Sequence, residues 1–453
     1  MKLDRTIAPK SKVARQFELP EITTLTLTNG LPVYFSQKAK LPIIKISLII
    51  PGGSRFDDYG NEGLAYLTSL VWDEGAGKYS SLQLADEIDK LGSSIDVSTS
   101  PDHIYITMTS LTENFERTLE LFSQIIQSPH FNKTEFEREK KKHVTKIVQS
   151  FDNPSYIAAN AFQKNIFKGS PYDKPILGYS NSVDSLTKQM AKDYYNKIIT
   201  NADSKLIAVG AIESDYLIDQ LNFYLNKLEF RSNGKVSMVH PARNSANLYF
   251  IHKEGASQSE IVAGHLCKDR SAPDHLAAKL ANSILGGQFS SRINLNLRED
   301  KGYTYGAQSA LSYNQFMGYF SVSTSVQSEY TFQSIQEIQK EVINLRNDIF
   351  ENEISFSKAY LVKQFPAMFE TYSQLLQRLT TKVIHDLDDY YDTYIQNIWD
   401  LSKDDILAAA NEYFVPEELS FFVVGNKDMI KDNIQESVGL NLIMLDKLGN
   451  PIS

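Results

Sequence analysis

Histidine and cysteine, the side chains that most often bind catalytic metals, are few and scattered in this sequence of 453 residues. Two histidines three or four positions apart on a helix can bind one metal ion together, and none of the eight histidines has such a partner. They are His103, His130, His143, His240, His252, His265, His275 and His385. Because Cys267 is the only cysteine, a thiolate-rich zinc site and an intramolecular disulfide are both excluded. The sequence predicts no metal site in this chain.

Two segments contain acidic residues at spacings that could suggest a metal site. Glu139 and His143 are four positions apart on a predicted helix, a spacing more typical of a surface ion pair than of half a metal site. The acidic residues between 386 and 392 lack the glycine and the loop register of a calcium-binding EF-hand, so we expect a solvated face. They are Asp386, Asp388, Asp389 and Asp392.

The overall charge limits the class of partner. The chain has 46 Lys and Arg against 55 Asp and Glu, a net charge of −9, which argues against binding to nucleic acid. No stretch approaches the roughly 18 apolar residues of a membrane-spanning helix. The N-terminus has basic residues without an apolar segment behind them, so we expect a cytoplasmic protein. A periplasmic location stays open if a signal peptide has been removed.

An internal repeat organises the chain. The apolar run Ile46–Gly53 has a counterpart in Ile261–Leu266, and Lys205–Gly210 matches Leu419–Gly425, in both cases at an offset of 215 residues. All four runs are typical of buried strands. We therefore expect two homologous domains, 1–235 and 248–453, with a polar linker over 236–247.

Helices are predicted between the strands of each half. Leu276, Leu280 and Ile284 recur every four residues, with Pro273 expected in the first turn and a glycine pair at the end. A capping box of Thr134 and Glu137 predicts a helix over 134–150. Further helices are expected at Met190–Ile198 and Lys403–Tyr413. Strands followed by clustered helices, twice over, indicate an α+β fold with helices on one face of a mainly antiparallel sheet in each domain.

Several segments then point to a family. The runs that carry the resemblance are Thr28–Phe35, Gly53–Ala65, Asp152–Pro154, Pro171–Gly178, Leu285–Arg292 and Leu297–Tyr305. They resemble the pitrilysin/insulinase family of zinc peptidases over about residues 25–425. That resemblance implies two peptidase-like domains that form half of a clamshell around a chamber.

The zinc motif of that family is missing. The resemblance places an H-x-x-E-H motif directly after Gly63–Ala65, where this chain has Tyr66, Leu67, Thr68, Ser69 and Leu70. The family's third ligand, a glutamate, falls on Lys146, and an ammonium donates hydrogen bonds and does not bind a metal. We expect an inactive site in which Tyr66 and Leu70 pack into the core, and no peptidase activity from the chain alone.

A second set of family residues is present. The pattern L-R-E-x-x-G-x-x-Y supplies an arginine and a tyrosine that approach the scissile bond, and it matches Arg298 and Tyr305. Both side chains can donate hydrogen bonds to a peptide carbonyl as it becomes an oxyanion. The alternative is that Arg298 pairs with Glu299 or Asp300 and Tyr305 packs in the sheet. Gly286 and Gly287 fit a substrate-facing loop and a simple helix stop equally well.

The resemblance therefore implies a two-chain peptidase. This chain would be its non-catalytic, substrate-binding subunit, and a homologous partner would carry H-x-x-E-H and the zinc. Peptide substrates would be held by pairing with a sheet edge. The competing interpretation is a structural subunit of a larger complex, like the core proteins that the family contributes to respiratory complexes.

Overall fold

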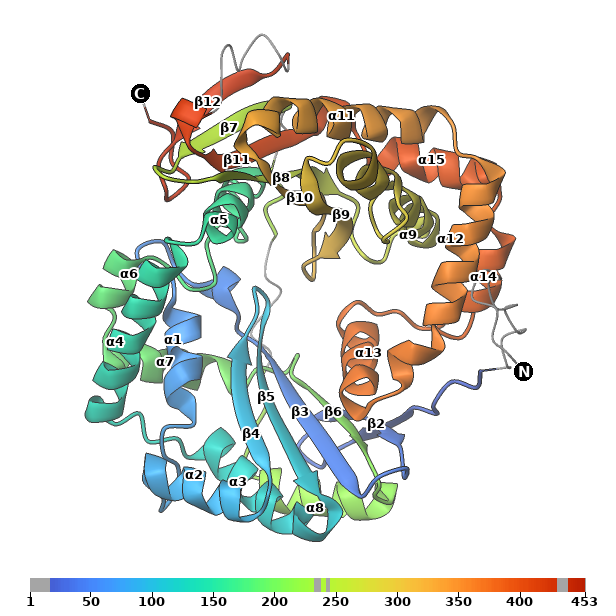
Figure 1. Cartoon of the computed structure of the whole chain (residues 1–453). Coiled ribbons are helices and arrows are strands. Elements are labelled where there is room, and N and C mark those ends of the chain that lie inside the picture. The colour runs from blue at the N-terminus through green and yellow to red at the C-terminus, as the bar shows by residue number, and fades with distance from the viewer. Residues whose placement is uncertain (1–16, 232–237, 242–244, 430–438, 453) are drawn as a thin grey trace, which may run out of the picture.

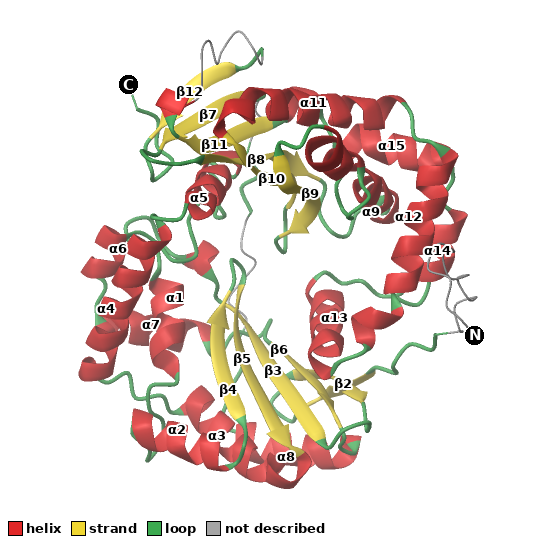
Figure 2. Ribbon diagram, viewed as in Figure 1, coloured by secondary structure: helices red, strands yellow, loops and turns green. Residues whose placement is uncertain are grey.

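Two six-stranded sheets face each other across the middle of the molecule (Figures 1 and 2). The computed structural model describes residues 17–231, 238–241, 245–429 and 439–452. The α+β class with two peptidase-like domains is confirmed. Residues 236, 237 and 242–244 of the predicted linker lie outside the described residues, and the linker segment runs between the last strand of one sheet and the first strand of the other.

The first sheet has the strand order β1-β2-β6-β3-β5-β4. Its neighbours are antiparallel except for the parallel pair β2 and β6. The strands are β1 (Thr23–Thr26), β2 (Pro32–Gln37), β3 (Ile43–Pro51), β4 (Ser94–Thr99), β5 (His103–Leu111) and β6 (Lys205–Gly210).

The second sheet has the order β12-β7-β11-β8-β10-β9, with β7 parallel to both β11 and β12. The strands are β7 (Asn247–His252), β8 (Gln258–Cys267), β9 (Thr304–Tyr313), β10 (Gly318–Gln327), β11 (Ser420–Gly425) and β12 (Asn441–Leu445). Strands β2, β3, β5 and β6 begin 215 residues before β7, β8, β10 and β11, respectively. The predicted duplication is confirmed strand by strand.

The helices surround both sheets. In the first half they are α1 (Leu64–Trp72), α2 (Ser81–Lys90), α3 (Phe115–Gln127), α4 (Lys133–Ser150), α5 (Pro154–Ile166), α6 (Ser180–Ser185), α7 (Lys188–Ile198) and α8 (Ser214–Leu225). In the second half they are α9 (His275–Leu285), α10 (Arg292–Asn294), α11 (Thr331–Asn347), α12 (Glu351–Gln364), α13 (Tyr372–Ile384), α14 (Tyr394–Asp400) and α15 (Lys403–Tyr413). Among the described residues, no helix combines the length and apolar character needed to cross a lipid bilayer.

Two local predictions about helix ends are wrong. Helix α4 begins after Asn132, so Thr134 lies inside the helix and does not cap it. Pro273 lies in the turn before α9, outside its first turn. The predicted bodies of the helices are nevertheless present, because their apolar spacing, and not the cap, decides which face is buried.

Each domain lends one helix to the sheet of the other. Phe162 of α5 packs edge-on against Phe422 of β11, with ring centroids 5.6 Å apart, and fills the space that Gly264 of β8 leaves open. In return, α13 lies on β3 and β6, where Leu375 shares a core with Ile207. Successive strand residues point to opposite faces, so each sheet packs its own helices on one face and a borrowed helix on the other.

Candidate functional site

The four positions expected to hold the zinc motif come together on two packed helices. Tyr66, Ser69 and Leu70 lie on α1, and Lys146 lies on α4. The buried Asp57 carboxylate fixes the start of α1 by accepting hydrogen bonds from the backbone N–H groups of Gly63 (2.8 Å) and Ala65 (2.9 Å). Gly63, the N-cap residue just before α1, has a φ of 95°, a conformation that favours glycine.

Lys146 and Tyr66 contact each other directly. The Lys146 ammonium donates a hydrogen bond of 2.6 Å to the Tyr66 phenol oxygen and also lies 5.1 Å from the centre of the Tyr66 ring. Beneath them, the His143 ring packs against the Tyr66 ring with centroids 4.8 Å apart. A phenol and a cation therefore stand at two of the three positions where the resemblance places zinc ligands, and Leu70 stands at the third.

The expectation that this site is filled as core is only half right. Leu64 and Leu67 are buried in the first core, as predicted. Tyr66 and Leu70 are half-buried, because α1 turns this face toward the exposed Lys146 and not into the sheet. Ser69 is buried and donates 2.7 Å to the Tyr66 carbonyl, so its hydroxyl is not directed at solvent.

The residues at these positions do not fit a zinc ion. An ammonium group offers no lone pair while protonated, and the phenol already accepts its hydrogen bond. Within the described parts of the chain, no three His, Cys, Asp or Glu side chains gather in an arrangement that could hold a metal.

Glu139 and His143 also behave differently from the predicted surface ion pair. His143 is buried, makes a 2.8 Å hydrogen bond through Nε2 to the Leu177 carbonyl, and burial lowers its pKa to about 4. Glu139 instead pairs with Arg138 at 2.9 Å and Lys142 at 2.7 Å. The acidic residues from Asp386 to Asp392 are exposed, as predicted.

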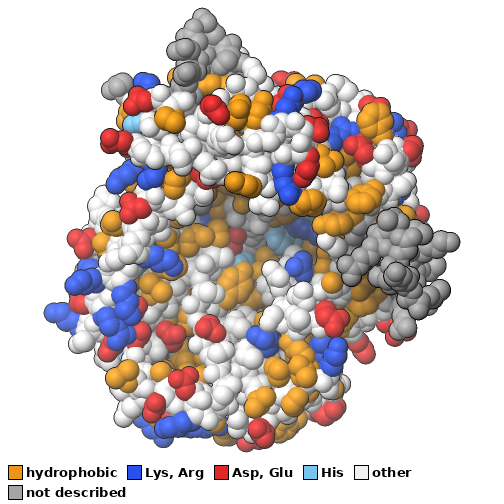
Figure 3. Space-filling model, viewed as in Figure 1, with side chains coloured by type: hydrophobic (Ala, Val, Ile, Leu, Met, Phe, Trp, Pro, Cys, Tyr) orange, Lys and Arg blue, Asp and Glu red, His pale blue; other side chains and the backbone are white. Residues whose placement is uncertain are grey.

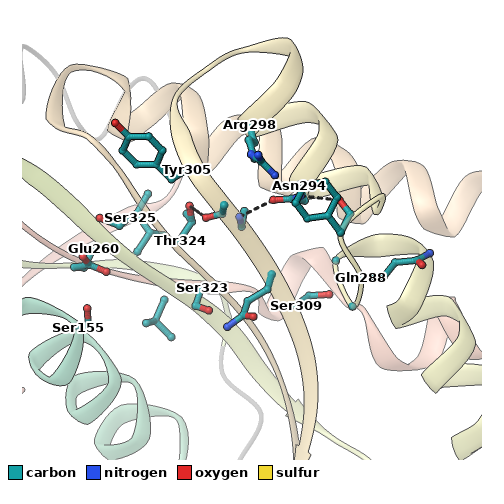
Figure 4. Close-up of a pocket in the computed structure, with 18 of the residues that line it drawn as sticks. Ser155, Glu260, Gln288, Asn294, Arg298, Tyr305, Ser309, Ser323, Thr324 and Ser325 are labelled. Carbon is teal, nitrogen blue, oxygen red and sulfur yellow. Dashed lines mark hydrogen bonds between the residues drawn. The ribbon is translucent and has the colours of Figure 1, made fainter. Parts of the chain in front are cut away.

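The second expected site is a pocket of about 710 Å³ on the inner side of the second sheet (Figure 4). Arg298, Tyr305, Gly286 and Gly287 all line it. Arg298 comes from the π-helical turn η3 (Leu295–Asp300), and Tyr305 comes from the start of β9. Such π-helical turns occur often at functional sites because they re-aim one side chain without breaking the helix.

The two donors stand along the same rim of the pocket but do not converge. The Arg298 guanidinium lies 4.5 Å from the centre of the Phe289 ring and 3.5 Å from a Glu299 carboxylate oxygen. Tyr305 is 93% exposed, and its hydroxyl points away from Arg298 (Figure 4). The alternative in which Tyr305 packs in the sheet is therefore wrong, whereas the pairing of Arg298 with Glu299 is present.

Gly286 is the predicted helix stop, and Gly287 faces the pocket, as a substrate-facing loop would. Gly286 ends α9 and packs so closely on β9 that an added Cβ would meet Ser309 Oγ at 2.5 Å. Its carbonyl accepts 2.9 Å from the Ser309 N–H. Gly287 is exposed on the pocket lining.

The pocket also contains residues that sequence reasoning missed. Ser155 and Ala159 reach it from α5, the helix borrowed from the first domain, and Glu260 comes from β8. Ser155 and Ala159 lie more than a hundred positions from Arg298, and nothing in the local pattern of these residues or of Glu260 signals the contact.

The edge strands β9 and β4 differ in whether their outer backbone groups already have hydrogen-bond partners. The outer edge of β9 is partly closed, since Ser309 and Ala307 bond to Gly286 and Asn294. The outer edge of β4 pairs with no described strand, and β4 runs beside α1. Its backbone groups are therefore free to pair with an extended peptide.

Residues 33–180 match the family described as Insulinase (Peptidase family M16), and residues 185–361 match the Peptidase M16 inactive domain. The chain belongs to the M16 peptidase family. The first match lies within the first half, and the second begins at the end of α6 and continues from the first half into the second.

Individual M16 relatives are distant. The "Uncharacterized zinc protease" of Rickettsia felis is 25% identical over 74% of this chain and 81% of its own length. "Non-peptidase homolog YmxG" of Helicobacter pylori is 22% identical over 87% of this chain and 92% of its own. "Mitochondrial-processing peptidase subunit beta" of Bos taurus is 20% identical over 76% and 71%.

A solved structure shares the fold. The crystal structure of a peptidase M16 inactive domain from Pseudomonas fluorescens superposes with a TM-score of 0.84 at 22% identity, covering 90% of this chain and 98% of that one.

Proposed function

We propose that this chain is the non-catalytic, substrate-binding subunit of a heterodimeric M16 zinc peptidase that degrades or processes peptides. A homologous partner with an H-x-x-E-H motif would supply the zinc and the general base. The observation that carries the proposal is the contrast between two sites, because Lys146 and Tyr66 close one and Arg298 and Tyr305 stay open in the other.

The exposure of Tyr305 supports a binding role. A tyrosine that is 93% exposed contributes little to the stability of its own chain, and exposed aromatic side chains are frequent anchors in binding sites. Phe289, which is 67% exposed, stands beside Arg298 on the same pocket. These side chains together offer two hydrogen-bond donors and an apolar surface to a peptide.

The position of the pocket also supports it. The space-filling view is hollowed at its centre (Figure 3), and the pocket is built from the second sheet and from α5 of the first domain. A peptide in that hollow would reach both the donors and the free edge of β4. Backbone pairing at an edge reads peptide geometry more than side chains.

Two relatives give a precedent for the division of labour. One is named as a subunit of a processing peptidase, and another is named as a non-peptidase homolog. A second candidate function remains a structural subunit of a larger complex. Tyr66 and Lys146 do not fit a zinc ion, and this is compatible with a substrate-binding subunit and with a structural subunit. The open Arg298 pocket is the observation that favours the substrate-binding subunit.

A native co-purification of this chain from its source cells tests the proposal. We expect a partner of similar length in equal amount, with H-x-x-E-H in its sequence. Association with a membrane complex, or a homodimer alone, would support the structural alternative.

A further inference from the structure

A second cavity, of about 320 Å³, lies between α9, β9 and α13 and is lined by three cationic side chains. They are Arg270, Lys279 and Arg378, and we call this site the basic cavity. Arg270 is buried, and the other two are half-buried. A water molecule takes about 30 Å³ in the liquid, so the cavity has room for a group of several heavy atoms.

The cations of the basic cavity have no counter-ion. In the described chain, no Asp or Glu oxygen lies within 4.0 Å of the charged nitrogens of Arg270, Lys279 or Arg378. The nearby Asp274 is already engaged, because it accepts 2.6 Å from Lys268 and 2.7 Å from Tyr413. Charges withdrawn from water are normally paired, so three cations without an acidic partner in one cavity favour the binding of an anion.

Aromatic rings position these cations. The Arg270 guanidinium lies 4.2 Å from the centre of the Tyr390 ring, and the Lys279 ammonium lies 4.9 Å from that of Tyr394. Such contacts stabilise a cation by much less than the cost of burying it. The rings fix where the charges point and do not neutralise them.

Further polar atoms of the cavity also lack partners. The hydroxyls of Tyr313 and Tyr394, Nδ1 of His275 and Nε of Arg378 are buried without a hydrogen-bond partner among the described residues. Tyr394 is 0% and His275 is 6% exposed. Buried polar groups are normally hydrogen-bonded, so these atoms are available to hydrogen-bond a ligand in the cavity.

The surroundings of Lys279 disfavour its charged form and lower its pKa. Burial first, and then the charges of Arg270 and Arg378, lower its pKa to about 7. The same surroundings lower the pKa of His275 well below its usual range. The residues that line the cavity thus disfavour the charged forms of Lys279 and His275.

We propose that the basic cavity is a binding site for an oxyanion, a carboxylate or phosphate group, held by Arg270, Lys279, Arg378 and the buried hydroxyls. The oxyanion has two candidate sources: a free small anion, or an acidic residue of a peptide inside the molecule. The cavity shares Gly287 and Ser309 with the Arg298 pocket, so a peptide could reach both. The site itself does not depend on the proposed peptidase role.

Calorimetric titration of the full chain below pH 7 tests this site. The probes are inorganic phosphate, glutarate, and an acetylated tri-glutamate peptide beside its tri-glutamine counterpart. Binding of phosphate or glutarate identifies a free-anion site, and binding of the glutamate peptide alone identifies a site for acidic residues of a peptide.

Three variants decide whether the cavity is the binding site. Lys279→Gln and Arg378→Gln should each weaken binding about tenfold or more, since each removes a charged donor. Lys363→Gln removes an exposed lysine of α12 and should leave binding unchanged. Equal binding by all variants, or no binding of any probe at millimolar concentration, would overturn the proposal. Melting curves check folding, because Lys279→Gln relieves repulsion and should not lower the melting temperature.

Discussion

The Lys146 ammonium lies 2.6 Å from the phenol oxygen of Tyr66, and this contact joins the two helices that would each supply zinc ligands in an active M16 peptidase. Side chains at positions 66 and 146 can therefore meet across the two helices, as two ligands of one metal ion would have to. Whether the helices are placed as in an active peptidase can be tested by changing the four side chains.

Restoring those side chains should restore a zinc site. The combined variant Tyr66→His, Ser69→Glu, Leu70→His and Lys146→Glu places two histidines four positions apart on α1 and a carboxylate opposite them on α4. We expect one bound zinc per chain by elemental analysis. A three-substitution variant that keeps Lys146 is the control and should bind little. Failure of the complete variant to bind zinc would show that the two helices are not placed as in a peptidase.

Gly286 should tolerate no side chain. A Cβ there would meet Ser309 Oγ at 2.5 Å and its backbone nitrogen at 2.7 Å, so Gly286→Ala should lower the free energy of unfolding by about 1–3 kcal/mol. At Gly306 of the same pocket, the nearest atom is Asn294 Oδ1 at 3.8 Å. Gly306→Ala should stay within about 0.5 kcal/mol in urea unfolding. Equal effects would refute the close approach of α9 to β9.

The pKa of Lys279 predicts the sign of one pH dependence. The folded pKa of about 7 lies below the usual lysine value, so between these values the unfolded chain binds the extra proton and stability rises with pH. Below pH 7 the lysine is charged in both states, and the full cost of burying it applies. Lys279→Gln should therefore raise the melting temperature most below pH 7 and progressively less above it. If the difference in melting temperature between Lys279→Gln and the unchanged protein did not vary with pH, the lowered pKa would not belong to Lys279.

Arg298 should matter only in the assembled enzyme. In a mixture with the zinc-bearing partner, Arg298→Ala should reduce peptide turnover about 10- to 1000-fold, the usual effect of losing an oxyanion donor. Arg346→Ala, which removes an arginine of α11 that pairs with Glu417, is the matched control and should leave turnover unchanged. An unaltered rate in Arg298→Ala would favour the structural alternative.

The strands and helices were readable from sequence because their signals are local. Lys205–Gly210 and Lys403–Tyr413 were predicted with the observed bounds, since a buried apolar run and a serine-capped helix depend on neighbouring residues. The capping box at Thr134 failed because Asn132 begins the helix earlier, and boundary signals compete over one or two residues.

Contacts between distant segments were not readable. The packing of α5 on the second sheet brings Ser155 into the Arg298 pocket, and the packing of α13 brings Arg378 into the basic cavity with Arg270. Neither pairing leaves a periodic trace in the sequence, because each depends on how whole sheets and helices assemble. The same holds for Tyr66, whose half-buried position follows from the packing of α1 on α4 and not from its neighbours.

Peptide cleavage by this chain alone, by its H-x-x-E-H partner alone and by their equimolar mixture, each with and without a chelator, tests the central claim most directly. We predict chelator-sensitive cleavage by the mixture and none by this chain. Chelator-sensitive cleavage by the purified chain alone, accompanied by bound zinc, would contradict the claim that its zinc positions have lost their function.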